Sequence, residues 1–201
     1  PHLCYTNKSG YRADGNCRAC MVEIEGERVL AASCIRKPTS EMKVNTTSAK
    51  AKKSRELVFE LLLSDQPDRD IAHDNDSKFW NWIDKVDVKE SRFPKKTPCQ
   101  SDTSHPSMAV NLDACIQCNL CVRACREVQV NDVIGMAYRG DNSKIVFDFD
   151  DPMGDSSCVA CGECVQACPT GALMPASIVD KDGVGFSKVD EKVNSVCPYC
   201  G

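Results

Sequence analysis

CIQCNLCVRAC at residues 115–125 and CVACGECVQAC at residues 158–168 are the two segments that decide the fold. Both have the spacing C-x2-C-x2-C-x3-C, and the second run repeats the first 43 positions later. Eight of the fifteen cysteines of the 201-residue chain lie in these runs. Disulfide frameworks have scattered, paired cysteines, whereas closely spaced runs and an odd total favour metal ligation. The runs therefore predict two metal sites built from one repeated unit.

The repeated spacing is that of bacterial ferredoxins with two [4Fe–4S] clusters, where the fourth cysteine of each run binds the cluster of the other run. Pro169 follows Cys168 as the motif expects, but Arg126 stands where the first run would have its proline. Zinc is the alternative, because zinc sites with four cysteines also use C-x2-C pairs. The expected ligands are Cys115, Cys118, Cys121 and Cys168 for one cluster, and Cys158, Cys161, Cys164 and Cys125 for the other.

A third set of cysteines lies near the N-terminus with the spacing C-x12-C-x2-C-x13-C, a variant of the plant-type [2Fe–2S] pattern with a longer first gap. Gly15 lies where the backbone has to approach the inorganic sulfides. Alternation over residues 21–24 and 28–31 predicts a hairpin that returns the last cysteine to this site. Zinc also competes here. The expected [2Fe–2S] ligands are Cys4, Cys17, Cys20 and Cys34.

Three cysteines remain outside these sets. Cys197 and Cys200 form a C-x2-C pair at the end of the chain, compatible with zinc, a redox dithiol or part of a further [4Fe–4S] site. Cys99 stands alone and has no assignment. Since the sequence holds no catalytic triad, phosphate loop or paired carboxylates, we expect no catalytic residue within residues 1–201.

Charge and hydropathy exclude several partners. The net charge of −4 and the absence of a basic arm disfavour nucleic acid and anionic membrane surfaces. No apolar run approaches the roughly 20 residues of a membrane span. The chain begins at Pro1 and stops within a ligand motif, so we expect a piece of a longer polypeptide.

Local patterns predict several further elements. An amphipathic helix is expected over residues 48–64, with Leu57, Val58, Leu61 and Leu62 on its apolar face. Ser77 is expected to cap a short helix, and short strands are expected at residues 109–112 and 145–149.

Together these segments resemble the front end of the molybdenum- or tungsten-dependent, NAD-linked formate dehydrogenases, in their catalytic (alpha) subunit. The resemblance covers essentially the whole chain and rests on residues 15–20, 111–118 and 158–173 and on the final VCPYCG. It is shared in part with the large peripheral subunit of NADH:quinone oxidoreductase and with iron-only hydrogenases. The tail looks like the start of the [4Fe–4S] motif that opens the bis-pterin domain, which favours formate dehydrogenase over hydrogenase.

One expected feature of this family is missing. Such arms carry a further [4Fe–4S] cluster held by H-x3-C-x2-C-x5-C, and those positions fall here on Gln66, Asp70, His73 and Phe79. We therefore expect this cluster to be absent, with Phe79, Trp80 and Trp82 filling its volume. In the respiratory enzyme that cluster lies on the route toward quinone, so its loss favours formate dehydrogenase.

The resemblance implies an α+β chain in four parts. These are a partial [2Fe–2S] ferredoxin-like (β-grasp) segment at 1–40, a helical linker at 41–106, a two-[4Fe–4S] bacterial-ferredoxin-like domain at 107–179, and a linker with the start of the pterin-domain motif at 180–201. It further implies a cytoplasmic arm that relays single electrons between a downstream Mo or W bis-pterin centre and a flavin- and NAD-binding iron–sulfur subunit. The alternatives are a peripheral subunit of NADH:quinone oxidoreductase and a stand-alone ferredoxin-like carrier.

Overall fold

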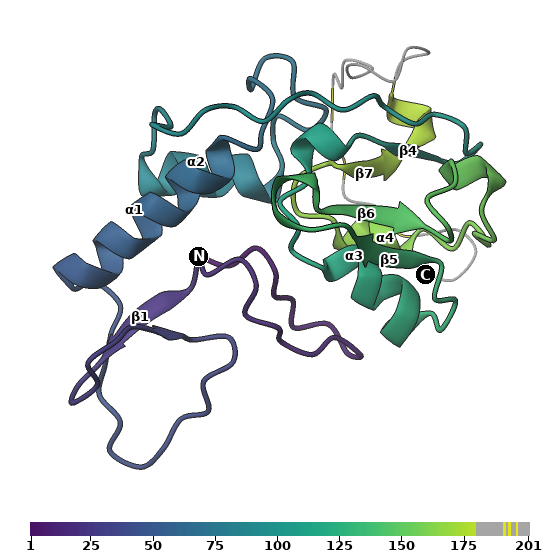
Figure 1. Cartoon of the computed structure of the whole chain (residues 1–201). Coiled ribbons are helices and arrows are strands. Elements are labelled where there is room, and N and C mark those ends of the chain that lie inside the picture. The colour runs from purple at the N-terminus through teal and green to yellow at the C-terminus, as the bar shows by residue number, and fades with distance from the viewer. Residues whose placement is uncertain (180–190, 192, 194–195, 197–201) are drawn as a thin grey trace.

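The computed structural model describes residues 1–179 together with residues 191, 193 and 196. In this part of the chain, helices combine with three small antiparallel sheets, so the predicted mixture of α and β structure is confirmed. In Figure 1 the N-terminal hairpin and helices α1 and α2 lie on one side, and the strand pairs β4–β7 and β5–β6 with helices α3 and α4 lie on the other. The β-grasp type of the first segment stays a prediction.

The N-terminal hairpin forms where the alternating pattern predicts it. Strand β1 (Met21–Ile24) pairs antiparallel with β2 (Ala31–Ala32), with Met21 opposite Ala32. Gly26 permits the turn between them because its φ of +84° lies in the left-handed region. A third strand, β3 (Val44–Asn45), pairs with the other edge of β1 and is too short to show a period in the sequence.

Helix α1 (Ala49–Leu63) matches the predicted helix, and the Ser48 hydroxyl caps it by accepting from the Ala51 N–H at 3.2 Å. The prediction of its apolar face is wrong in part, because Leu61 is 52% exposed and Leu57 is also exposed. The helix instead packs on β1 and α2 through a face that includes Ala51 and the fully buried Phe59.

Helix α2 (Lys78–Val86) begins at the predicted cap, where the Ser77 hydroxyl accepts from the Trp80 N–H. Phe79 is fully buried and packs edge-on against Trp80, with ring centroids 5.3 Å apart, and against Phe59 at 6.2 Å. The Phe79 N–H also donates to the Pro169 carbonyl at 3.0 Å. This bond joins the helical linker to the segment that follows the second cysteine run.

The remaining strands form two pairs, one joining the two ends of the cysteine-rich region and one lying between the two cysteine runs. Strand β4 (Met108–Val110) pairs with β7 (Leu173–Pro175), and β5 (Ile134–Ala137) pairs with β6 (Lys144–Phe147). The strands predicted near residues 109–112 and 145–149 are confirmed, while β5 and β7 were not predicted. Short helical turns complete the segment: η1 (Leu112–Ala114), η3 (Gly140–Asn142), η4 (Met153–Asp155) and η5 (Ala176–Ile178).

The two cysteine runs repeat one backbone conformation. Gln117 and Asn119 in the first run have φ angles of +53° and +67°, and their counterparts Ala160 and Gly162 have +58° and +74°. In each run, residues with a left-handed backbone conformation lie on both sides of the second cysteine. The loop therefore curves around the centre of its cysteine group. The 43-residue repeat of the sequence is therefore also a repeat of structure.

The runs differ after their third cysteine. Helix α4 (Glu163–Ala167) ends before Cys168, which is extended as expected for a residue preceding proline. Helix α3 (Leu120–Arg123) instead continues into a π-helical turn, η2 (Ala124–Val128). The substitution of Arg126 for proline explains the continuation, because proline would remove a backbone donor there.

Two buried cores hold these parts together. One lies among β4, β5, β6 and α3, and the other joins Leu3, Phe59, Phe79, Trp80 and Leu120 from three separate parts of the chain. None of the described helices combines the length and apolarity needed to cross a membrane.

Phe79→Ala tests the second core. Removing a fully buried aromatic ring is expected to destabilise the fold by about 3–5 kcal/mol, because the cavity cannot collapse around the lost ring. The control is Leu61→Ala, which removes an exposed side chain and is expected to change stability by no more than about 0.5 kcal/mol. Denaturant midpoints measured anaerobically by circular dichroism would compare them, and equal midpoints would contradict this packing.

Candidate iron–sulfur sites

The four N-terminal cysteines gather around one loop. The backbone N–H groups of Cys4 and Cys17 each donate to the other residue's sulfur at 3.4 Å, and the thiols of Cys20 and Cys34 also interact. The hairpin β1–β2 returns Cys34 to the loop as the sequence predicts, since the Ser33 N–H donates to the Cys20 carbonyl at 3.2 Å. Gly15 leaves room for this return, because a Cβ there would lie 2.9 Å from Ile35.

Hydrogen bonds favour a thiolate at the centre of this group. The Cys4 thiol and the N–H groups of Ala19, Cys4 and Leu3 lower the pKa of Cys17 to about 5 against the effect of burial. Burial and the Cys20 thiol raise the pKa of Cys34 to about 11. Donors that point at sulfur stabilise a thiolate ligand and raise the reduction potential of an iron–sulfur cluster.

The first cysteine run forms a group with one member of the second run. Cys115, Cys118 and Cys121 each interact electrostatically with Cys168. A cavity lies between them and is lined by all four of these residues. Burial raises the pKa of Cys115 to about 11 and raises those of Cys118 and Cys121 further. The structure thus brings together the four residues that the spacing predicts for one cluster.

The second run forms the complementary group. Cys164 interacts electrostatically with Cys158, Cys161 and Cys125, and burial raises its pKa to about 12. The Val133 N–H donates to the Cys125 sulfur at 3.3 Å. Cys125 lies on η2 and Cys168 follows α4, so each helix carries its last cysteine across to the other group.

The three groups follow one another in space. Cys118 interacts with Cys17 of the N-terminal group, and Cys121 interacts with Cys164 of the third group. The Lys78 side chain lies at the first junction, where burial lowers its pKa by more than the thiols of Cys17 and Cys118 raise it.

These groups fit iron–sulfur clusters. A buried thiolate without a partner is costly, and a bound metal cation offsets that cost when the thiol proton is released to solvent. Among the described residues no three His, Cys, Asp or Glu side chains are arranged to hold a single metal ion. All thirteen described cysteines are free thiols, and the described part of the chain has no disulfide.

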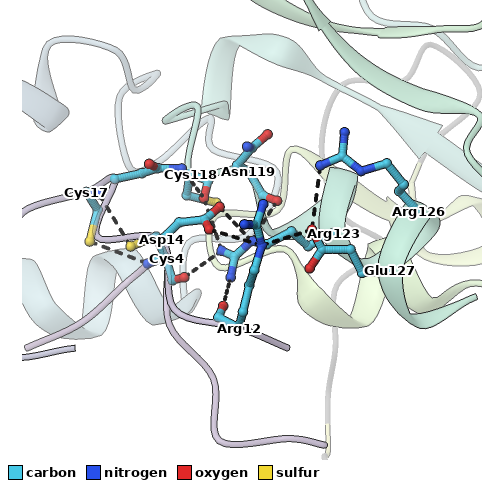
Figure 2. Close-up of polar contacts among 10 residues, drawn as sticks. Cys4, Arg12, Asp14, Cys17, Cys118, Asn119, Arg123, Arg126 and Glu127 are labelled. Atoms are coloured by element: carbon cyan, nitrogen blue, oxygen red, sulfur yellow. Dashed lines mark hydrogen bonds and ion pairs between the residues drawn. The ribbon is translucent and has the colours of Figure 1, made fainter. Parts of the chain in front are cut away.

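A buried arginine, which the sequence analysis missed, joins the first two groups. Arg123 is fully buried on α3 and pairs with Asp14, with 3.1 Å between its Nε and the carboxylate. Figure 2 shows its guanidinium between the N-terminal loop and the first cysteine run. The repeat offered a signal for Arg123, because the equivalent position of the second run is Gln166, which is exposed.

Most of the positions expected for the family's His-ligated cluster make other contacts in this structure. The Gln66 amide donates to the Ala114 carbonyl at 2.9 Å, and the buried His73 ring contacts the Asn111 amide. Phe79 lies in the aromatic core, while Asp70 is exposed. The absence of that cluster stays a prediction.

Of the described cysteines, Cys99 is the one that belongs to none of these groups. The backbone N–H of the half-buried Cys99 donates to the Asp113 carboxylate, and Cys99 keeps no assignment. Cys197 and Cys200, with the predicted pterin-domain motif, lie outside the described residues.

Family models match both cysteine-rich parts of the chain. Residues 1–49 match a 2Fe-2S iron-sulfur cluster binding domain, and residues 114–172 match a 4Fe-4S dicluster domain. These matches confirm that the chain carries [2Fe–2S] and [4Fe–4S] domains.

Several longer proteins are similar to the chain. An NADP-reducing hydrogenase subunit from Solidesulfovibrio fructosivorans is 34% identical over 87% of the chain and 31% of that protein. A subunit of NADH-quinone oxidoreductase from Rhizobium meliloti is 30% identical over the whole chain and 23% of that protein. A Staphylococcus haemolyticus protein provisionally named a formate dehydrogenase is 27% identical over the whole chain and 24% of its own length.

The fold also matches a solved structure. A chain in the crystal structure of an NAD+-reducing [NiFe]-hydrogenase in the H2-reduced state superposes with a TM-score of 0.78 and 26% identity, covering 87% of this chain and 74% of that one. The present chain spans about a quarter to a third of the length of the curated relatives described above. The domains and similarities together indicate an iron–sulfur electron-transfer segment, similar to parts of these hydrogenase, quinone oxidoreductase and formate dehydrogenase proteins.

Proposed function

We propose that the chain is an electron-transfer arm that binds one [2Fe–2S] and two [4Fe–4S] clusters. The ligands would be Cys4, Cys17, Cys20 and Cys34 for the [2Fe–2S] cluster, Cys115, Cys118, Cys121 and Cys168 for one [4Fe–4S] cluster, and Cys158, Cys161, Cys164 and Cys125 for the other. When bound, the clusters supply one-electron redox chemistry. The protein would position them and tune them through buried donors and charges.

The observation that carries this proposal is the order of the three cysteine groups. The N-terminal group adjoins the Cys115 group through Cys17 and Cys118, and the Cys115 group adjoins the Cys158 group through Cys121 and Cys164. Such a series allows transfer in short steps, with the [2Fe–2S] site at one end. A stand-alone carrier with one exchange site would not need this arrangement.

Within a whole enzyme, we assign the arm to a formate dehydrogenase or CO2 reductase. The [2Fe–2S] end would face a flavin- and NAD-binding iron–sulfur subunit, and the Cys158 end would face a Mo or W bis-pterin domain begun by Cys197 and Cys200. Support comes from the similarity to the provisionally named formate dehydrogenase and from the residues that replace the ligands of the His-ligated cluster.

A hydrogenase arm is the second candidate, favoured by the 34% identity to an NADP-reducing hydrogenase subunit and by the match to the NAD+-reducing [NiFe]-hydrogenase chain. Metal analysis of the intact complex purified from its native source separates the candidates. Molybdenum or tungsten would indicate the formate enzyme, and neither metal together with hydrogen oxidation would indicate a hydrogenase.

Cluster content and ligation are tested with single Cys→Ser variants. The anaerobically purified chain is expected to contain about ten irons. Cys168→Ser should abolish the same electron paramagnetic resonance (EPR) signal as Cys115→Ser, because both residues are assigned to one cluster. Cys125→Ser should instead match Cys158→Ser, and Cys99→Ser is the control that keeps all iron.

Two results would contradict the assignment. Stoichiometric zinc without visible absorbance would exclude the iron–sulfur proposal altogether. Loss of one shared signal in Cys168→Ser and Cys158→Ser would show instead that each run binds its own cluster.

His73→Ala tests whether a His-ligated cluster is present. Iron content is expected to stay at the wild-type value, because His73 contacts the Asn111 amide and no cysteine stands at the other ligand positions. Loss of about four irons, measured on protein of equal purity, would show that His73 binds a cluster after all.

A further inference from the structure

The N-terminal loop and the first cysteine run meet around a single side chain. Arg123 donates through one terminal nitrogen to the Cys4 carbonyl at 2.7 Å and through the other to the Arg12 carbonyl. Longer contacts reach the carbonyls of Cys118 at 3.5 Å and Asn119 at 3.3 Å. Cys4 belongs to the [2Fe–2S] group and Cys118 to the adjacent group, so one guanidinium holds the backbone of a ligand residue from each.

The pairing with Asp14 explains how the charge is tolerated. A fully buried cation needs a partner and satisfied donors, and Arg123 has both. Asp14 lies in the loop that leads to Cys17, three residues later, so the ion pair holds this loop as well as the Cys4 segment. The planar fork of arginine can donate in several directions at once, whereas a lysine ammonium has no such fixed geometry.

Other contacts across this junction are weaker or more exposed. Asn16 donates to the Cys118 carbonyl at 3.5 Å, and the exposed Arg12 pairs with Glu127 at 3.0 Å. Figure 2 shows Arg126 on the same helical segment beside Glu127, whose carboxylate also pairs with Arg12. Among these polar contacts, those of Arg123 are the buried ones, and Arg126 offers a matched control.

We propose that Arg123, with Asp14, is a positioning residue that fixes the spacing between the [2Fe–2S] site and the Cys115 [4Fe–4S] site and so sets electron transfer between them. This inference rests on the proposed function, because it requires clusters at both sites. Neither residue is a cluster ligand. Their substitution should therefore leave the clusters bound while weakening the communication between them.

The test uses the cluster-loaded full chain and compares Arg123→Gln with Arg126→Gln. In reduced wild-type protein, the fast-relaxing [4Fe–4S] spin is expected to shorten the spin relaxation of the neighbouring [2Fe–2S] cluster, an effect that falls steeply with distance. Arg123→Gln should keep the wild-type iron content and lose this enhancement, while Arg126→Gln should retain it. Asp14→Asn should lose part of the relaxation enhancement, and Arg123→Lys should keep little of it.

Each outcome has a distinct meaning. Wild-type protein without a [2Fe–2S] signal would overturn the proposed function itself. Wild-type relaxation in fully loaded Arg123→Gln would overturn only the positioning role. If Arg123→Gln fails to bind its clusters, Asp14→Asn and Arg123→Lys take its place. Wild-type relaxation in these two variants when fully loaded would also overturn the positioning role. Parallel loss of iron in all three variants would do so as well.

Discussion

Burial of cysteine thiols is the constraint on which the rest of this structure depends. Cys118 and Cys121 are enclosed by other thiols and by apolar side chains, so burial and neighbouring sulfurs raise their pKa values. Such groups cannot become thiolates without a compensating cation, and an iron–sulfur cluster supplies one. The loops have residues with a left-handed backbone conformation beside Cys118 and Cys161. Backbone N–H groups also donate to sulfur atoms, as at Cys17 and Cys125.

This constraint also explains the arrangement of the polypeptide around the sites. Each cysteine run leads into a helix that carries its last thiol to the other group, and the hairpin returns Cys34 to the N-terminal group. The second core then holds these groups together, since Leu3, Phe79 and Leu120 come from three distant segments. Lys78 and the Arg123–Asp14 pair lie where the first two groups meet, so charged side chains gather at the junction between prospective redox centres.

The cysteine spacing was sufficient to predict which thiols lie close together, because the number of residues between cysteines limits how a loop can place their sulfur atoms. The hairpin, α1, α2 and their serine caps were also predictable from local periodicity and capping chemistry. The buried face of α1 was not, since Leu57 and Leu61 follow a helical pattern as well as Phe59 does, and only packing on β1 and α2 selects between them. Arg123 escaped prediction because its partners lie more than one hundred residues away, although the exposed Gln166 at the equivalent position of the repeat marked it as different.

The central claim is that three cysteine groups hold one [2Fe–2S] and two [4Fe–4S] clusters in series. Mössbauer spectroscopy of anaerobically prepared, 57Fe-enriched protein tests it most directly, because the two cluster types give separable spectra. The account predicts about one fifth of the iron in [2Fe–2S] sites and about four fifths in [4Fe–4S] sites. Iron in a single cluster type, or a [4Fe–4S] fraction equal to one cluster per chain, would contradict it.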